Sequence, residues 1–167
     1  MIRAISDFEQ TWSKEIEGTQ KILKHLTDKS LSHRVDEDGR TLGRLAWHIV
    51  TTIPEMMSKT GLVLAGPHPE APVPATAKEI FRVYSDAAIA LLEQVKKSWT
   101  DSSLELKDNM YGEMWTRGST LEALILHQTH HRGQMTVLMR QAGLDVPGVY
   151  GPARQEWAAF GMKPPAV

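Results

Sequence analysis

Apolar residues recur at steps of three and four along four long segments, and this period constrains the fold more than any other feature of the chain. Such steps place side chains on one face of an α-helix. The clearest stripe comprises Ile5, Phe8, Trp12, Ile16, Thr19, Leu23 and Leu26. The pattern predicts amphipathic helices, each of which must bury one face against the others. We expect these helices over roughly residues 2–29, 42–61, 76–99 and 119–142.

Local signals suggest where these helices begin and end. Thr41 is placed to cap the second helix, and Pro54 should kink it, because proline lacks the N–H and crowds the carbonyl four residues earlier. Capping boxes are predicted at Thr76–Glu79 and Ser119–Glu122. Gly143 follows the fourth segment in the position where helices commonly end.

The connecting segments differ in composition. Residues 62–75 are rich in proline and should form a loop, whereas residues 100–118 are polar and suit a short strand or an ordered crossover. The C-terminal tail has too much proline and glycine for a long helix, and only a short turn is expected over residues 153–160. The chain therefore predicts an all-α fold, a four-helix bundle with long crossover connections, in a single domain over residues 1–167.

Composition limits the chemistry. The chain has no cysteine, so any metal must be held by histidine, aspartate or glutamate, and any thiol must come from a substrate. The formal net charge of −1 gives no field that favours nucleic acid or an anionic membrane. No stretch approaches the roughly 18 apolar residues of a membrane span, and the charged N-terminus lacks a signal-peptide core. We therefore expect a cytoplasmic protein.

Three of the seven histidines fall between positions 127 and 131. His127 and His131 are four residues apart on a predicted helix, so their side chains share one face and their Cβ atoms lie about 5–6 Å apart. They belong to the inward stripe Leu124, His127, His131, Met135, Leu138 and Ala142. His130 points away from this pair. Two buried imidazoles need either a shared ion or hydrogen-bonding neighbours, because burial without partners costs on the order of a few kcal/mol.

A third ligand would have to come from another helix. His48 is the best candidate, because it follows Leu45 at the helical step in the segment RLAWHIVTT, which should face the core. His25, His33 and His68 are expected on the surface. The sequence thus predicts a metal site of His48, His127 and His131, with hydrogen-bonded core histidines as the alternative.

At these residues the chain resembles the DinB-like superfamily. The motif LAWHI is followed about 80 residues later by HQTHHRGQ, and the tail contains a P-G-x-Y-G-P pattern. The superfamily includes YfiT-like proteins, proposed to be metal-dependent hydrolases, and bacterial thiol-dependent transferases and isomerases. The resemblance covers nearly the whole chain. It implies a bundle that is often dimeric, a zinc or nickel ion on His48, His127 and His131, and a low-molecular-weight thiol such as bacillithiol or mycothiol as co-substrate.

The predicted ligand set allows more than one reaction. Three neutral histidines leave a divalent ion with its full charge and an open coordination position, which is the pattern of a catalytic zinc site. Bound water is acidified to a pKa of about 7, and a bound thiol ionises. The ligands alone do not choose between hydrolysis and thiol S-transfer of a small-molecule substrate.

Several other residues have roles that spacing does not fix. Glu113, Tyr150 and Glu156 are candidates for a general base. Trp47 and Trp115 could line a pocket mouth or belong to the core. Arg132 is expected in a salt bridge or a helix–tail contact, and Gly133 is expected to let another backbone approach closely.

A non-enzymatic protein is the alternative function. In that case the chain is a metal-stabilised helical bundle that acts through interaction, for example as a stress-response homodimer. No basic patch or recognition motif supports binding to DNA.

Overall fold

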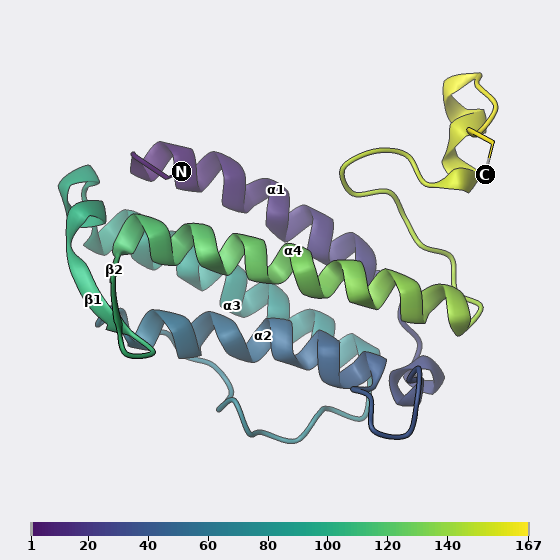
Figure 1. Ribbon diagram of the computed structural model, residues 1–167, viewed down its shortest axis with the longest axis horizontal. Helices are drawn as coiled ribbons and strands as arrows, with labels where there is room; N and C mark the ends of the chain where they lie inside the picture. The colour runs from purple at the N-terminus through teal and green to yellow at the C-terminus, as the bar shows by residue number, and fades with distance from the viewer. Residues whose placement is uncertain (1, 167) are drawn as a thin grey trace.

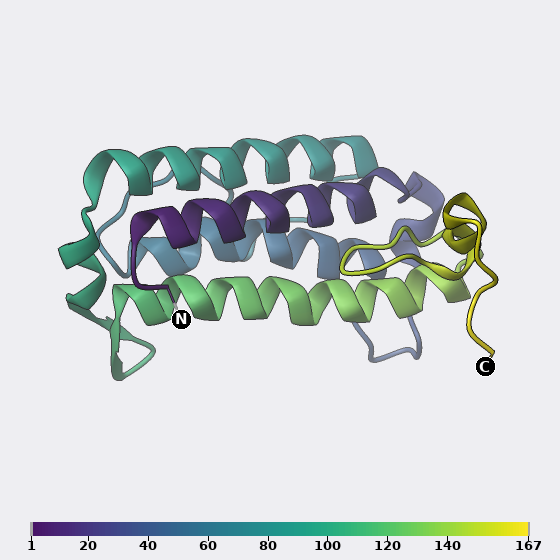
Figure 2. The same cartoon turned by 90° about the horizontal axis from the view of Figure 1, so that it is seen from above.

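Four amphipathic helices form, and each buries the stripe predicted for it. The computed structural model describes residues 2–166. Its long helices are α1 (Ile5–Lys24), α2 (Leu42–Ser58), α3 (Ala77–Ser98) and α4 (Arg117–Gln141). They lie side by side along the long axis of the molecule (Figure 1, Figure 2). The four-helix bundle predicted from the sequence is thereby confirmed.

The order of the helices around the bundle differs from their order in the chain. Helices α1 and α2 each pack mainly on α3 and α4. Residues 59–76 run back along the bundle, so that α3 lies parallel to α2 (Figure 1). This is the predicted crossover.

Trp47 holds the crossover against the bundle, because its side chain is buried and its Nε1 donates to the Ala71 carbonyl oxygen at 3.1 Å. Trp47 is therefore a core residue and does not line a pocket mouth.

Helix α1 ends earlier than its apolar stripe predicts. It stops at Lys24, and a 3-10 turn, η1 (Asp28–Ser32), follows. Thr27 caps this turn, since its side chain accepts from the Ser30 N–H at 3.2 Å. Leu26 and Leu31 remain buried on either side of the break. The stripe continues through the break, and the periodicity alone therefore predicted too long a helix.

Two of the predicted caps are confirmed and one is wrong. Thr41 and Thr76 cap α2 and α3, each accepting from the N–H three residues later. The Glu79 carboxylate binds Arg82 and does not complete the predicted capping box. Helix α4, in contrast, begins at Arg117 and is capped by Thr116, whose side chain accepts from the Ser119 N–H at 3.1 Å. Ser119 therefore lies within the helix. The preceding strand keeps Thr116 extended and so brings the helix start forward.

The segment between α3 and α4 is a compact hairpin. A 3-10 turn, η2 (Asp101–Glu105), leads into the antiparallel strands β1 (Lys107–Met110) and β2 (Glu113–Thr116). Tyr111 and Gly112 turn the chain with φ of 58° and 98°. Met110 is fully buried, so the hairpin closes one end of the core.

The C-terminal tail folds back over α1 and α4 (Figure 2). Gly143, with φ of 74°, ends α4 as predicted, and a last 3-10 turn, η3 (Arg154–Phe160), forms where a short turn was expected. A Cβ on Gly18 would lie 2.7 Å from Cγ1 of Val149, so the glycine inside α1 makes room for the tail.

No helix within residues 2–166 is both long and apolar enough to span a membrane.

Candidate metal centre

His48, His127 and His131 meet between two packed helices. His48 lies on α2, and His127 and His131 lie one turn apart on α4. The Nε2 atom of His127 is 3.2 Å from that of His48 and 3.1 Å from that of His131. One ligand atom from each of the three side chains lies within 4.8 Å of the others. The structure therefore brings together the three residues that the sequence predicted.

These spacings fit a single divalent ion. Tetrahedral ligands at about 2.0–2.1 Å from an ion are separated by roughly 3.3–3.4 Å. Without an ion, two facing Nε2 atoms can form a hydrogen bond only if one of them carries a proton. Even then, His127 Nδ1 is buried and has no hydrogen-bond partner among residues 2–166. The imidazoles are thus poorly satisfied as a purely structural hydrogen-bonded cluster. The arrangement is compatible with metal binding.

The imidazoles are kept neutral. Burial, with further contributions from the neighbouring imidazoles, lowers the pKa of both His48 and His127 from 6.5 to about 4. Burial also lowers the pKa of His131. Because a metal binds only the deprotonated ring nitrogen, these shifts keep lone pairs available at neutral pH.

Gln134 orients one of the three rings. Its Oε1 lies 2.7 Å from His131 Nδ1, so this nitrogen carries the proton and Nε2 presents its lone pair to the centre. Its amide nitrogen lies 3.1 Å from Nε2 of His130. His130 is exposed and stays outside the group, as predicted. Gln134 follows His131 by three residues, and this helical spacing is the sequence signal that identifies it as a neighbour of the imidazole.

Replacing Gln134 is expected to weaken metal binding. Gln134→Leu removes the acceptor that fixes the His131 tautomer, and loss of such an outer hydrogen bond typically lowers metal affinity by about 10–100-fold. Competition with a chromophoric chelator measures this directly. Gln141→Leu, an exposed position on the same helix, is the matched control. Equal affinities for the two variants would show that Gln134 does not support the site.

Glu55 also affects the electrostatics of the centre, although it was not among the residues predicted from the sequence. Its negative charge raises the pKa of His127, opposing the effect of burial. The carboxylate accepts from the Tyr111 hydroxyl at 2.8 Å and pairs with Lys59 at 3.3 Å. Glu55 follows His48 by seven residues, two turns along α2, and that spacing could have identified it.

The three candidates for a general base are held elsewhere. Glu113 accepts from Trp115 Nε1 at 2.8 Å, and Trp115 is half-buried within strand β2 of the hairpin. Glu156 accepts from the backbone N–H groups of Gly148 and Ala153 at 2.7–3.2 Å, which lowers its pKa. Neither is grouped with the histidines.

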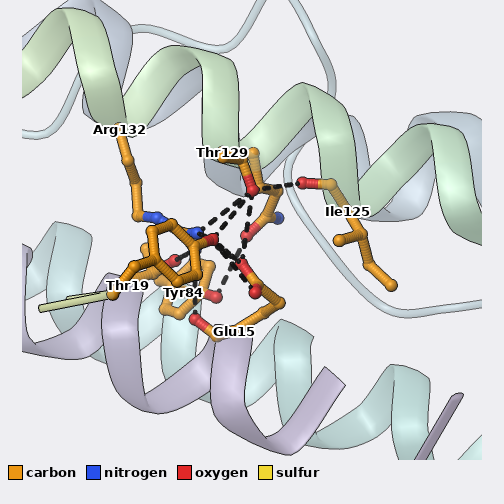
Figure 3. Close-up of polar contacts among 8 residues, drawn as sticks. Glu15, Thr19, Tyr84, Ile125, Thr129 and Arg132 are labelled. Atoms are coloured by element: carbon orange, nitrogen blue, oxygen red, sulfur yellow. Dashed lines mark hydrogen bonds and ion pairs between the residues drawn. The ribbon is translucent and has the colours of Figure 1, made fainter. Parts of the chain in front are cut away.

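Tyr150 belongs to a buried ionic cluster on the other side of α4. Its hydroxyl lies 2.9–3.0 Å from the Glu15 carboxylate and also contacts Arg132. Arg132 forms an ion pair with Glu15, and its Nη1 donates to Thr19 Oγ1 at 2.8 Å. Figure 3 shows Arg132 and Thr129 reaching from α4 toward Glu15 and Thr19 of α1. Arg132 thus makes both the salt bridge and the tail contact expected of it.

A second polar chain crosses the core beside the histidines. Tyr84 on α3 donates to Gln128 Oε1 at 3.1 Å, and Gln128 Nε2 donates to the Ile49 carbonyl oxygen of α2 at 3.4 Å. Both side chains are fully buried. Gln128 comes directly after His127 in the sequence, and Ile49 comes directly after His48. These hydrogen bonds therefore help to fix the register of α2 against α4.

The remaining predictions for single residues gave mixed results. His25 and His68 are exposed as expected, whereas His33 is half-buried. Gly133 was wrongly expected to admit a neighbouring backbone, because nothing lies within 4 Å of a Cβ built there. Gly118 has that role instead, since its Cβ would lie 2.8 Å from the Ile2 carbonyl oxygen.

Comparisons with known proteins agree with this architecture. A model described as the DinB family matches residues 1–165. The uncharacterized protein YrdA of Bacillus subtilis is 46% identical over 167 residues, which cover all of both chains. The crystal structure of a DinB-like protein from Bacillus cereus ATCC 10987 superposes with a TM-score of 0.87 at 49% identity, covering 90% of this chain and 100% of that one. The DinB-like protein YjoA of Bacillus subtilis shares the fold, with a TM-score of 0.68 at 16% identity and coverage of 88% and 99%.

Proposed function

The chain belongs to the DinB family, and on this basis we propose that it is a metal-dependent enzyme that uses His48, His127 and His131. The ion is zinc or nickel, and the reaction is thiol S-transfer or hydrolysis of a small molecule. The observation that carries the proposal is the convergence of three imidazoles from two helices, in which His127 Nε2 lies 3.2 Å from His48 Nε2 and 3.1 Å from His131 Nε2. Three neutral histidines would hold a divalent ion and leave a coordination position for a substrate or water, as catalytic sites require.

The ion would supply the charge that lowers the pKa of a bound thiol or water. The residues of this chain supply the remaining functions. Gln134 fixes the tautomer of His131, and burial keeps His48 and His127 neutral at the pH of the cell.

A cavity lies beside one histidine of the centre. Its volume is about 430 Å³, and it is lined by His131 and Gln134 together with apolar side chains and the charged residues Asp36 and Arg40. That volume lies within the range of small-molecule sites, roughly 300–1,000 Å³. The cavity supports a small-molecule substrate over a macromolecular one.

The test measures metal content and turnover on the same preparation. Untagged protein, purified without chelator, is expected to contain close to one divalent ion per chain by elemental analysis. Thiol transfer is assayed with cysteine, glutathione or bacillithiol and 1-chloro-2,4-dinitrobenzene, and hydrolysis is assayed with p-nitrophenyl acetate. Activity should disappear on chelation and return with zinc or nickel. Protein that neither retains nor takes up a divalent ion would contradict the proposal.

A non-enzymatic homodimer is the second candidate. Leu126 and Val137 on α4 are 62% and 53% exposed, and such apolar side chains favour contact with a second copy. This candidate predicts a metal-loaded dimer without turnover in either assay, whereas the enzyme predicts metal-dependent turnover. Sedimentation of the metal-loaded protein, combined with the assays above, separates the two.

A further inference from the structure

The cavity beside the three histidines has an apolar wall and two charged groups. Its apolar lining comes from Val35, Leu45, Val137 and Leu138, and its charged lining comes from Asp36 and Arg40. His131 lies in the same wall. A ligand whose reacting atom reaches the centre therefore extends past apolar side chains toward these charges.

Arg40 differs from the other arginines around it. Its side chain is exposed and makes no hydrogen bond or ion pair with any residue between positions 2 and 166. Arg34, on the same loop, donates to the Glu37 carbonyl oxygen at 2.8 Å, and Arg44 donates to the Pro69 carbonyl oxygen at 3.3 Å. Arg40 lines the same cavity as His131, so an unpaired guanidinium and one histidine of the centre face a single cavity.

The charges of the site define what they can bind. A divalent ion, Arg40 and Asp36 together leave two positive charges, since the three imidazoles are neutral and Glu55 is paired with Lys59. A ligand that carries one thiolate and one carboxylate neutralises both charges.

We propose that Arg40 binds the carboxylate of a small substrate thiol whose sulfur is held at the three-histidine centre. The guanidinium fork matches a carboxylate in two-point geometry, and the short apolar segment between the two groups lies on Leu45 and Leu138. This inference rests on the proposed metal function, and it makes Arg40 the residue that selects anionic thiols over neutral ones.

The experiment uses the full chain loaded with Co²⁺, whose visible spectrum reports bound metal and whose thiolate band reports bound sulfur. The probes are 3-mercaptopropionate and its neutral isostere 3-mercaptopropionamide. Wild-type protein should bind the acid roughly 10- to 100-fold more tightly than the amide, the usual advantage of a charge-assisted hydrogen bond. Arg40→Gln should reduce this preference to below about threefold, with Co²⁺ affinity unchanged.

Matched variants isolate the role of the guanidinium. Arg34→Gln removes the same charge from the same loop outside the cavity and should retain the full preference. Arg40→Lys keeps the charge without the fork and should give an intermediate preference.

The outcomes separate the two proposals. Co²⁺ binding with equal affinities for acid and amide, or an Arg40→Gln variant that keeps the preference, would overturn the role of Arg40 and leave the metal site standing. Failure to bind Co²⁺ would overturn both proposals.

Discussion

Arg132→Met is expected to lower the free energy of unfolding by about 3–5 kcal/mol, because it leaves the buried carboxylate of Glu15 without its cation. Arg132 and Glu15 are only 3% and 6% exposed, so water cannot replace the lost partner. The substitution also removes the hydrogen bonds to Thr19 and Tyr150 that tie α4 to α1 and to the tail. Urea denaturation of the metal-free protein measures the change.

An exposed ion pair provides the control for this experiment. Arg82 pairs with Glu79 and Asp86, and its side chain is 59% exposed. Arg82→Met should therefore lower the free energy of unfolding far less than Arg132→Met. The double variant Glu15→Leu with Arg132→Met should recover part of the loss, because no buried charge is then left alone. Similar losses for Arg132→Met and Arg82→Met would show that burial of the pair does not matter.

His127→Ala is expected to weaken metal binding by more than the roughly 10–100-fold expected for loss of a supporting hydrogen bond. His127 is central to the group, since its Nε2 is the atom close to both of the others, at 3.2 and 3.1 Å. Without it, the remaining two ligands come from different helices. Elemental analysis and chelator competition measure the loss.

The same variant should also lose stabilisation by metal. An ion present at 1,000 times its dissociation constant raises the free energy of unfolding by about 4.1 kcal/mol when it binds only the folded chain. We expect that increase in the wild type and in His130→Ala, whose histidine stays outside the group. Retention of metal by His127→Ala would show that the ion binds at another site.

The features that the sequence predicted well depend on local spacing. The step of four between His127 and His131, and the step from Leu45 to His48, survive folding because a helix preserves them. Helix period therefore predicted both the bundle and the three residues at its centre. The ends of α1 and α4 were less predictable, since Thr27 and Thr116 act as caps only in the context of the turns around them.

The features that the sequence did not reveal join distant parts of the chain. Glu15 meets Arg132 and Tyr150 across separations of more than 100 residues, and no local pattern predicts such a contact. Arg40 lies in a loop, where periodicity gives no direction for a side chain. The substrate, the identity of the metal and a homodimer stay predictions.

Neighbouring residues of α4 hold the helix from two sides. His131 faces α2 and the cavity, while Arg132, the next residue, is tied to Glu15 of α1. Rolling α4 about its axis would break the ionic cluster as it displaced the imidazoles, so the three-histidine centre is built on a helix that resists rotation. Accommodation of ligands of different length then falls to the segment from Val35 to Arg40, the one wall of the cavity outside the bundle. The sequence of that loop can vary without changing the arrangement of the three histidines.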